Sequence, residues 1–151
     1  MGKLKPVGAL SALCRRSVDS VFIAVFGDGC AAYEKADYVT ALKRCKRAAT
    51  KNAARPQFTL GLMYSNGHGV VQDYAEALRW YKLSAAQNNA EAQNNIGAMY
   101  YSGQGVAQDY AAALRWFNLA AGWGNTHAEK NINIVIAKMT PQQIFDAHKV
   151  T

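Results

Sequence analysis

Two segments in the middle of the chain place apolar and small residues three and four positions apart, the spacing of one face of an α-helix. The stripes are Gln57, Leu60, Gly61 and Tyr64 in the first segment and Gln93, Ile96, Gly97 and Tyr100 in the second. A further stripe follows each of them, made by Tyr74, Ala77, Leu78, Tyr81 and Ala85 and then by Tyr110, Ala113, Leu114, Phe117 and Ala121. The pattern predicts two antiparallel helix pairs, in which the small residues allow close approach.

Glycine and aspartate mark the boundaries between these helices. Two glycines separated by one residue follow the first helix of each pair, at Gly67 and Gly69 and again at Gly103 and Gly105. They predict a turn, because glycine adopts backbone angles that other residues resist. Val70 and Val106 come next and are expected to pack this turn onto the core. Asp73 and Asp109 stand where a helix cap is expected, and Glu76 gives the first of them the spacing of a capping box.

The two helix pairs are copies of one unit. When residues 54–89 are laid over residues 90–125, 19 of the 36 positions are identical. A fixed period of this length is typical of a solenoid, in which each unit is a supersecondary structure that packs against its neighbours. Trp80 and Trp116 match in this alignment and are expected to pack between helices, whereas Trp123 has no counterpart, since Gln87 holds the matching place.

Weaker copies flank the two full units. Upstream, one period before the second helix of the first full unit, the matching residues are Asp37, Tyr38, Ala41, Leu42 and Ala49. Downstream, one period after the first helix of the second full unit, they are Ala128, Asn131 and Ile132. We therefore expect a repeat domain over residues 28–139, with partial repeats at 28–53 and 126–139. Thr140 and Pro141 predict the cap and first turn of a closing helix within residues 140–151.

The repeated motif resembles a known family. Leu60-Gly61, Tyr64, Gly67, Gly69-Val70, Asp73, Ala77, Trp80-Tyr81 and Ser84-Ala85, repeated from Ile96-Gly97 to Ala120-Ala121, are similar to the Sel-one-like repeat, a relative of the tetratricopeptide repeat. The resemblance implies an all-α fold, a right-handed α-α superhelix whose first helices line a concave surface. It also implies an adaptor or scaffold, and many bacterial members are exported.

The resemblance leaves an enzymatic alternative. Some cysteine-rich members of the family are linked to penicillin binding and hydrolysis, and they carry a disulfide within each repeat. The two full repeats here contain no cysteine, so this β-lactamase-like activity is not carried over to the chain. An export-linked protein of the cell envelope with such a role remains the alternative.

Analogy with tetratricopeptide units places eight residues on the concave groove. They are Arg55, Phe58, Leu62, Ser65, Glu91, Asn94, Ala98 and Tyr101. An asparagine amide offers both donors and an acceptor to an extended peptide backbone, so Asn94 is the strongest candidate. Phe58, Leu62 and Tyr101 are candidate apolar and aromatic anchors. Some of the eight can instead pack against neighbouring helices.

Positive charge is concentrated at the amino-terminal end. Residues 1–53 hold ten of the 17 basic residues and four of the ten acidic ones, in a chain of net charge +7. The candidate basic face consists of Lys43, Arg44, Lys46, Arg47 and Lys51. A solvated helix face explains it, and an acidic or nucleic-acid partner is the alternative. Aromatic residues that could stack on bases are not interleaved with it, so nucleic-acid binding is disfavoured.

Catalytic and metal-binding signatures are missing from the sequence. Its three histidines are isolated, and none of the nucleophile, zinc-protease or phosphate-loop motifs occurs. Cys14, Cys30 and Cys45 form no Cys-x-x-Cys, and a disulfide between Cys30 and Cys45 stays open beside two buried thiols. We expect no enzymatic activity, no cofactor and no metal site.

The first 27 residues are expected to be a leader, either a signal peptide or a disordered segment. Neither of their two short apolar runs combines an export-signal core with a small-x-small cleavage site. An exported or periplasmic protein follows if the leader is a signal, and a cytoplasmic one otherwise. No apolar stretch approaches the length of a membrane span. Overall the sequence predicts a module that binds a protein or peptide partner, with self-association open.

Overall fold

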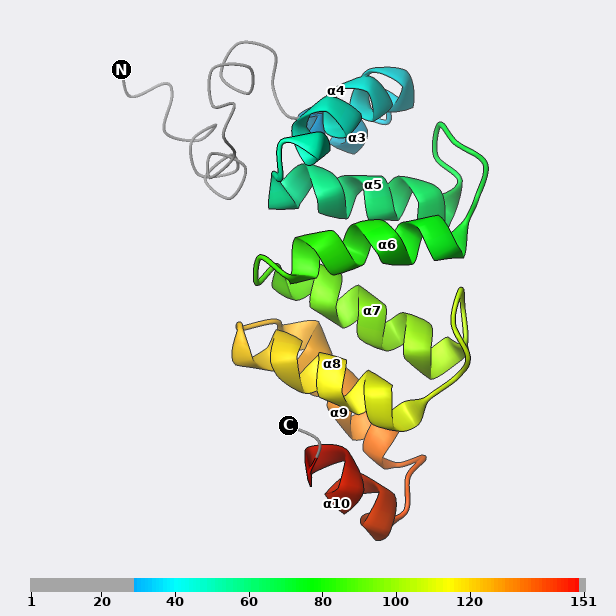
Figure 1. Cartoon of the computed structure of the whole chain (residues 1–151), viewed down its shortest axis with the longest axis vertical. Coiled ribbons are helices and arrows are strands. Elements are labelled where there is room, and N and C mark those ends of the chain that lie inside the picture. The colour runs from blue at the N-terminus through cyan, green and yellow to red at the C-terminus, as the bar shows by residue number, and fades with distance from the viewer. Residues whose placement is uncertain (1–28, 150–151) are drawn as a thin grey trace, which may run out of the picture.

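The computed structural model of the protein describes residues 29–149, which form a stack of antiparallel helices (Figure 1). The helices are α3 (Cys30–Glu34), α4 (Tyr38–Thr50), α5 (Ala54–Asn66), α6 (Tyr74–Ala85), α7 (Ala90–Ser102), α8 (Tyr110–Gly122), α9 (Thr126–Ile136) and α10 (Pro141–Lys149). Every regular element in this part of the chain is a helix, which confirms the predicted all-α solenoid. The leader predicted for residues 1–27 lies outside the described residues.

We call α5, α7 and α9 the first helices, and α4, α6 and α8 the second helices, of successive units. None of the helices from α3 to α10 is long and apolar enough to cross a membrane.

The second helices begin at aspartates, as predicted. The side chains of Asp37, Asp73 and Asp109 accept hydrogen bonds from backbone amides three residues further on, at 3.2, 3.1 and 3.0 Å. Asparagine does the same for the first helices, since Asn89 and Asn125 accept from Ala92 and Ala128 at 2.9 and 2.8 Å. These caps satisfy amides that the helix itself leaves without partners, and so fix where each helix starts.

The capping box predicted at Glu76 does not form. The Asp73 amide donates to the Tyr64 carbonyl at 2.9 Å, because the chain arrives from the glycine turn beside the end of α5. The Glu76 carboxylate instead accepts from Arg79 one turn further along, through Nη2 at 2.5 Å and Nε at 3.2 Å. This Arg79 hydrogen bond is the main reason that the pKa of Glu76 lies below its usual value.

Each glycine turn packs onto the unit before it. Gly67, Gly69, Gly103 and Gly105 have φ angles of 69, 73, 72 and 71°, which favour glycine. A Cβ on Gly69 would lie 3.0 Å from the Tyr38 Cβ, and one on Gly105 would lie 2.8 Å from the Tyr74 backbone. As expected, both valines pack onto the core: Val70 belongs to the hydrophobic cluster that contains Tyr38, and Val106 to the one that contains Tyr74. The turns therefore join successive units as well as the helices of one unit.

Within each unit, a glycine of the first helix accepts an aromatic ring of the second. A Cβ on Gly61 would come within 2.4 Å of the Tyr81 ring, and one on Gly97 within 2.7 Å of the Phe117 ring. Both rings are almost fully buried, and burial raises the pKa of Tyr81 to about 12. The predicted close approach of the paired helices therefore occurs at these contacts.

The carboxyl end is closed by α9 and α10. Ala128 and Val135 of α9 and Ala147 of α10 are buried in one cluster with the core of α8. Thr140 accepts a hydrogen bond from the Gln143 amide at 3.2 Å, and Gln143 Oε1 accepts one from the Thr140 amide at 2.8 Å. The predicted cap and closing helix are both present, and their pairing is the reciprocal arrangement of a capping box.

The amino-terminal cysteines act as small packing groups. Cys45 is fully buried against Gly29, where a Cβ would lie 2.6 Å from its sulfur. Cys30 is half-buried and accepts a hydrogen bond from Thr59 at 3.5 Å. The structure does not join Cys30 to Cys45 by a disulfide, in keeping with two thiols in or beside the core.

Candidate partner-binding groove

Polar side chains of successive first helices meet on one face of the solenoid. Arg55 of α5 donates to Glu91 of α7 at 3.0 Å, a contact between residues one repeat apart. Asn131 of α9 donates to Oδ1 of Asn94 in α7 at 2.9 Å. These two contacts form a ladder across α5, α7 and α9, and three of its four members are predicted groove residues. They place the predicted positions of neighbouring units side by side.

A hollow of about 500 Å³ lies beside this ladder. Its lining includes four of the eight predicted groove residues, Phe58, Leu62, Glu91 and Asn94. Most of Phe58 is nonetheless buried. The centroid of its ring lies 5.8 Å from the centroid of the Tyr81 ring and 5.5 Å from the guanidinium carbon of Arg55. Phe58 can therefore offer a partner only an edge of its ring, whereas Leu62 is half-exposed.

The other predicted groove residues do not line the hollow. Ala98 is exposed on α7 and Ser65 is half-buried near the end of α5. Tyr101 packs on Tyr110 of α8, with ring centroids 5.4 Å apart. It therefore belongs to the packing between α7 and α8 as much as to an open surface.

Sequence reasoning missed the far wall of the hollow. Asn95, Gly124, Asn125, Thr126 and His127 complete the lining. The last four come from the turn between α8 and α9 and from the start of α9, and the repeat alignment alone did not place that segment against α7. His127 was predicted only to be one of three isolated histidines. Among the missed residues, Asn95 could have been proposed from the sequence, because it is a second asparagine directly after Asn94.

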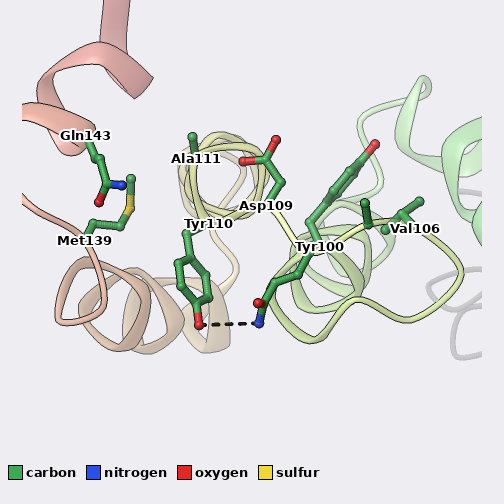
Figure 2. Close-up of a pocket in the computed structure, with 9 residues that line it drawn as sticks. Tyr100, Val106, Asp109, Tyr110, Ala111, Met139 and Gln143 are labelled. Atoms are coloured by element: carbon green, nitrogen blue, oxygen red, sulfur yellow. Dashed lines mark hydrogen bonds between the residues drawn. The ribbon is translucent and has the colours of Figure 1, made fainter.

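A second hollow, of about 610 Å³, lies near the start of α8 (Figure 2). Tyr110 stands between Tyr100 on one side and Met139 and Gln143 on the other, and its hydroxyl accepts from Gln108 at 3.4 Å. The corresponding tyrosines, Tyr38 and Tyr74, are each covered by the glycine turn of the next unit. Residues 126–139 carry no such turn, which explains why this space is open.

The predicted basic face lies on α4 and its carboxyl end. Lys43, Lys46, Arg47 and Lys51 are exposed, and Arg44 is half-buried. The opposite side of α4 is buried through Ala41, Cys45, Ala48 and Ala49.

His68 and the three tryptophans lie in different environments. His68 stacks on Tyr38 with centroids 4.5 Å apart and shares a hydrogen bond of 3.0 Å with Tyr33. Trp80 is buried, Trp116 packs partly against the core and Trp123 is 54% exposed. Between residues 29 and 149, no three side chains of His, Cys, Asp or Glu converge to hold a metal ion.

Residues 57–89 and 90–122 each match the family model of the Sel1 repeat. The chain contains two Sel1 repeats. The second match begins at the predicted boundary, residue 90, and the first begins three residues after the predicted start at residue 54. The partial repeats at 28–53 and 126–139 lie outside the two matches and stay predictions, although both segments contain helices.

Solved structures agree with this assignment. A protective antigen from uropathogenic Escherichia coli strains, which displays an SLR fold, matches 62% of the chain with 40% identity and a TM-score of 0.61. A Sel1 repeat protein from Oxalobacter formigenes matches 62% with 35% identity and a TM-score of 0.60. The matches span 20% and 38% of those two proteins, so the chain corresponds to only part of either.

A more distant match shows the fold alone. Cysteine rich protein B from Helicobacter pylori is 20% identical, with a TM-score of 0.55 over 69% of this chain and 94% of that one. None of the curated protein sequences matches the chain.

Proposed function

We propose that this Sel1 repeat protein binds a peptide or protein partner in the groove of its first helices and catalyses no reaction on it. The observation that carries the proposal is the hollow of about 500 Å³ beside the ladder of α5, α7 and α9. Sel1 repeats are generally protein-interaction modules, and two of them supply most of the lining.

The chemistry of the hollow suits an extended polypeptide. Asn94 uses its Oδ1 to accept from Asn131, while an amide nitrogen can also donate to a backbone carbonyl. Asn95, Asn125 and Thr126 add further donors and acceptors to the same lining. Leu62 and the edge of Phe58 supply apolar contact at one side. Such a mixture of polar groups around a small apolar area is typical of peptide recognition.

The test is an affinity pull-down with the full chain as bait. A Glu91→Ala, Asn94→Ala double variant removes two lining side chains without touching the buried core, and we expect at least tenfold weaker retention of a specific partner. Glu129→Ala with Asn133→Ala is the matched control, since both residues are exposed on α9 and neither lines the hollow. The control should retain the partner.

A photoreactive amino acid placed at Ala98 gives a second readout. Ala98 is exposed on α7 one helical turn after Asn94, so it should cross-link to the bound partner, whereas the same group at exposed Ala137 should not. Equal retention by both double variants, with helicity unchanged, would remove the groove from the binding surface.

A further inference from the structure

The second helices carry nearly all of the cationic charge of the helical repeats. Helices α4, α6 and α8 contain seven Lys and Arg residues and a single carboxylate, Glu76. Helices α5, α7 and α9 contain two basic and two acidic residues. Glu76 is itself paired with Arg79. The face of the molecule formed by the second helices is therefore positive overall, and its charge is densest at the end formed by α4, the predicted basic face.

The repeat aligns these charges into rows. Lys43, Arg79 and Arg115 occupy one position of successive units, and Lys46 and Lys82 occupy another. Lys43, Lys46, Arg79 and Lys82 are exposed and Arg115 is half-buried. Because equivalent positions of stacked units point in similar directions, these side chains share one surface on α4, α6 and α8.

Large apolar side chains stand exposed between the cations. Leu83 and Leu119 are repeat counterparts and are 41% and 45% exposed, and each directly follows a position of the Lys46 row. Trp123, one helical turn after Leu119, is 54% exposed. None of these residues lines either hollow. We call the surface made by Lys43, Lys46, Lys82, Leu83, Leu119 and Trp123 the second-helix face.

We propose that the second-helix face binds the surface of an anionic lipid membrane. Long lysine side chains can reach phosphate headgroups, while single leucines and a tryptophan enter the boundary between headgroups and acyl chains. Leu83 lies next to Lys82 on α6, whereas Leu119 and Trp123 lie on and just after α8, whose only basic residue is the half-buried Arg115. These apolar groups are spread over two helices and lie in neither hollow, so they suit a broad interface better than one peptide. Each lysine near an anionic surface contributes comparable attraction, which makes the binding depend on several of them at once.

The test is co-sedimentation of the full chain with vesicles of phosphatidylcholine, with and without phosphatidylglycerol. Binding is expected only to the anionic vesicles, and it should fall about tenfold or more in a Lys46→Gln, Lys82→Gln variant. The matched control is Lys130→Gln with Lys138→Gln, which removes the same charge from exposed positions outside the second-helix face. The control should lose much less.

Tryptophan fluorescence tests the apolar part of the interface. Trp123 should shift to shorter wavelength on the anionic vesicles, and Trp123→Phe should abolish that shift while Trp80 stays buried. Equal losses in the two lysine variants, or no binding to the anionic vesicles, would overturn the proposal. So would tighter binding to polyglutamate or single-stranded RNA at moderate salt without a Trp123 shift. The Glu91→Ala, Asn94→Ala variant should bind vesicles normally, which separates this surface from the groove.

Discussion

Two glycines determine how closely the helices of each unit pack. Gly61 and Gly97 each face an aromatic ring at a distance that leaves no room for a Cβ. The sequence predicted that small residues would let the paired helices approach closely, but it did not assign a particular ring to either glycine. It did not predict the cost of filling the space, which depends on whether the ring can move. Tyr81 is 2% exposed, so its ring is held on all sides.

Gly61→Ala should therefore destabilise the protein. The new methyl group would overlap the Tyr81 ring, and overpacking of this kind costs about 1–3 kcal/mol. Gly122→Ala is the matched control, since nothing lies within 4 Å of a Cβ at that helical position; it should be neutral or stabilise by up to about 1 kcal/mol. Urea denaturation of the two variants measures both effects. Similar unfolding midpoints would show that the ring moves aside freely.

The groove is the part of the site that residue-level reasoning predicted least completely. Analogy with related repeats assigned Leu62, Glu91 and Asn94 to a partner-binding groove, and all three line one hollow; their role in binding stays a prediction. It offered Phe58 as an anchor, but most of that ring is used in packing against Tyr81. The sequence pattern assigns a residue to a helix face, while the share of its surface taken by a neighbouring helix depends on tertiary packing.

The ends of the first helices hold a buried polar network that differs between units. Gln57 donates to the Ala49 carbonyl at 3.2 Å and accepts from Gln87 at 2.8 Å. Its counterpart Gln93 donates in the same way to Ala85 at 3.2 Å, but its Oε1 is buried without a hydrogen-bond partner. Trp123 holds the place of Gln87 in this unit, and its indole N–H does not donate to Gln93 Oε1. The two units thus share the hydrogen bond from the glutamine to the preceding helix, but the second unit lacks the hydrogen bond to the glutamine oxygen.

Trp123→Gln should supply that missing donor. The fair comparison is with Trp123→Met, because methionine has a similar shape and no amide. We expect the glutamine variant to be about 0.5–1.5 kcal/mol more stable than the methionine variant, the usual net value of a hydrogen bond. Thermal unfolding measures the difference. In the first unit, Gln87→Met should destabilise the protein because it removes the donor to Gln57. Equal stability of the two Trp123 variants would show that a glutamine at position 123 does not donate to Gln93.

At the scale of the whole molecule, the stack is made of units that contact mainly their neighbours. The period of 36 residues predicted this arrangement from Leu60, Gly67 and Asp73 and their counterparts, because a strict repeat leaves little choice of topology. The α8–α9 turn against α7 was not predictable in this way. Its position depends on how far the last, degenerate units turn relative to the full ones, and no residue pattern encodes that angle.

A duplicated unit should lengthen the stack. Inserting a second copy of residues 90–125 before residue 126 adds one helix pair and one further interface between units, so both the unfolding midpoint and the denaturant m-value should rise. A scrambled insertion of the same composition is the control. An unchanged m-value in the duplicated protein would mean that the added unit stays unfolded.

The spacing of the ladder across α5, α7 and α9 would also constrain which residues of a bound polypeptide contact it. Arg55 and Glu91 bridge the first helices of neighbouring units, and helices that pack together have axes about 8–10 Å apart. An extended chain rises about 3.3 Å per residue. If a partner binds across the ladder as proposed, about every third residue of it would meet an equivalent position, and its sequence motif would repeat with that spacing.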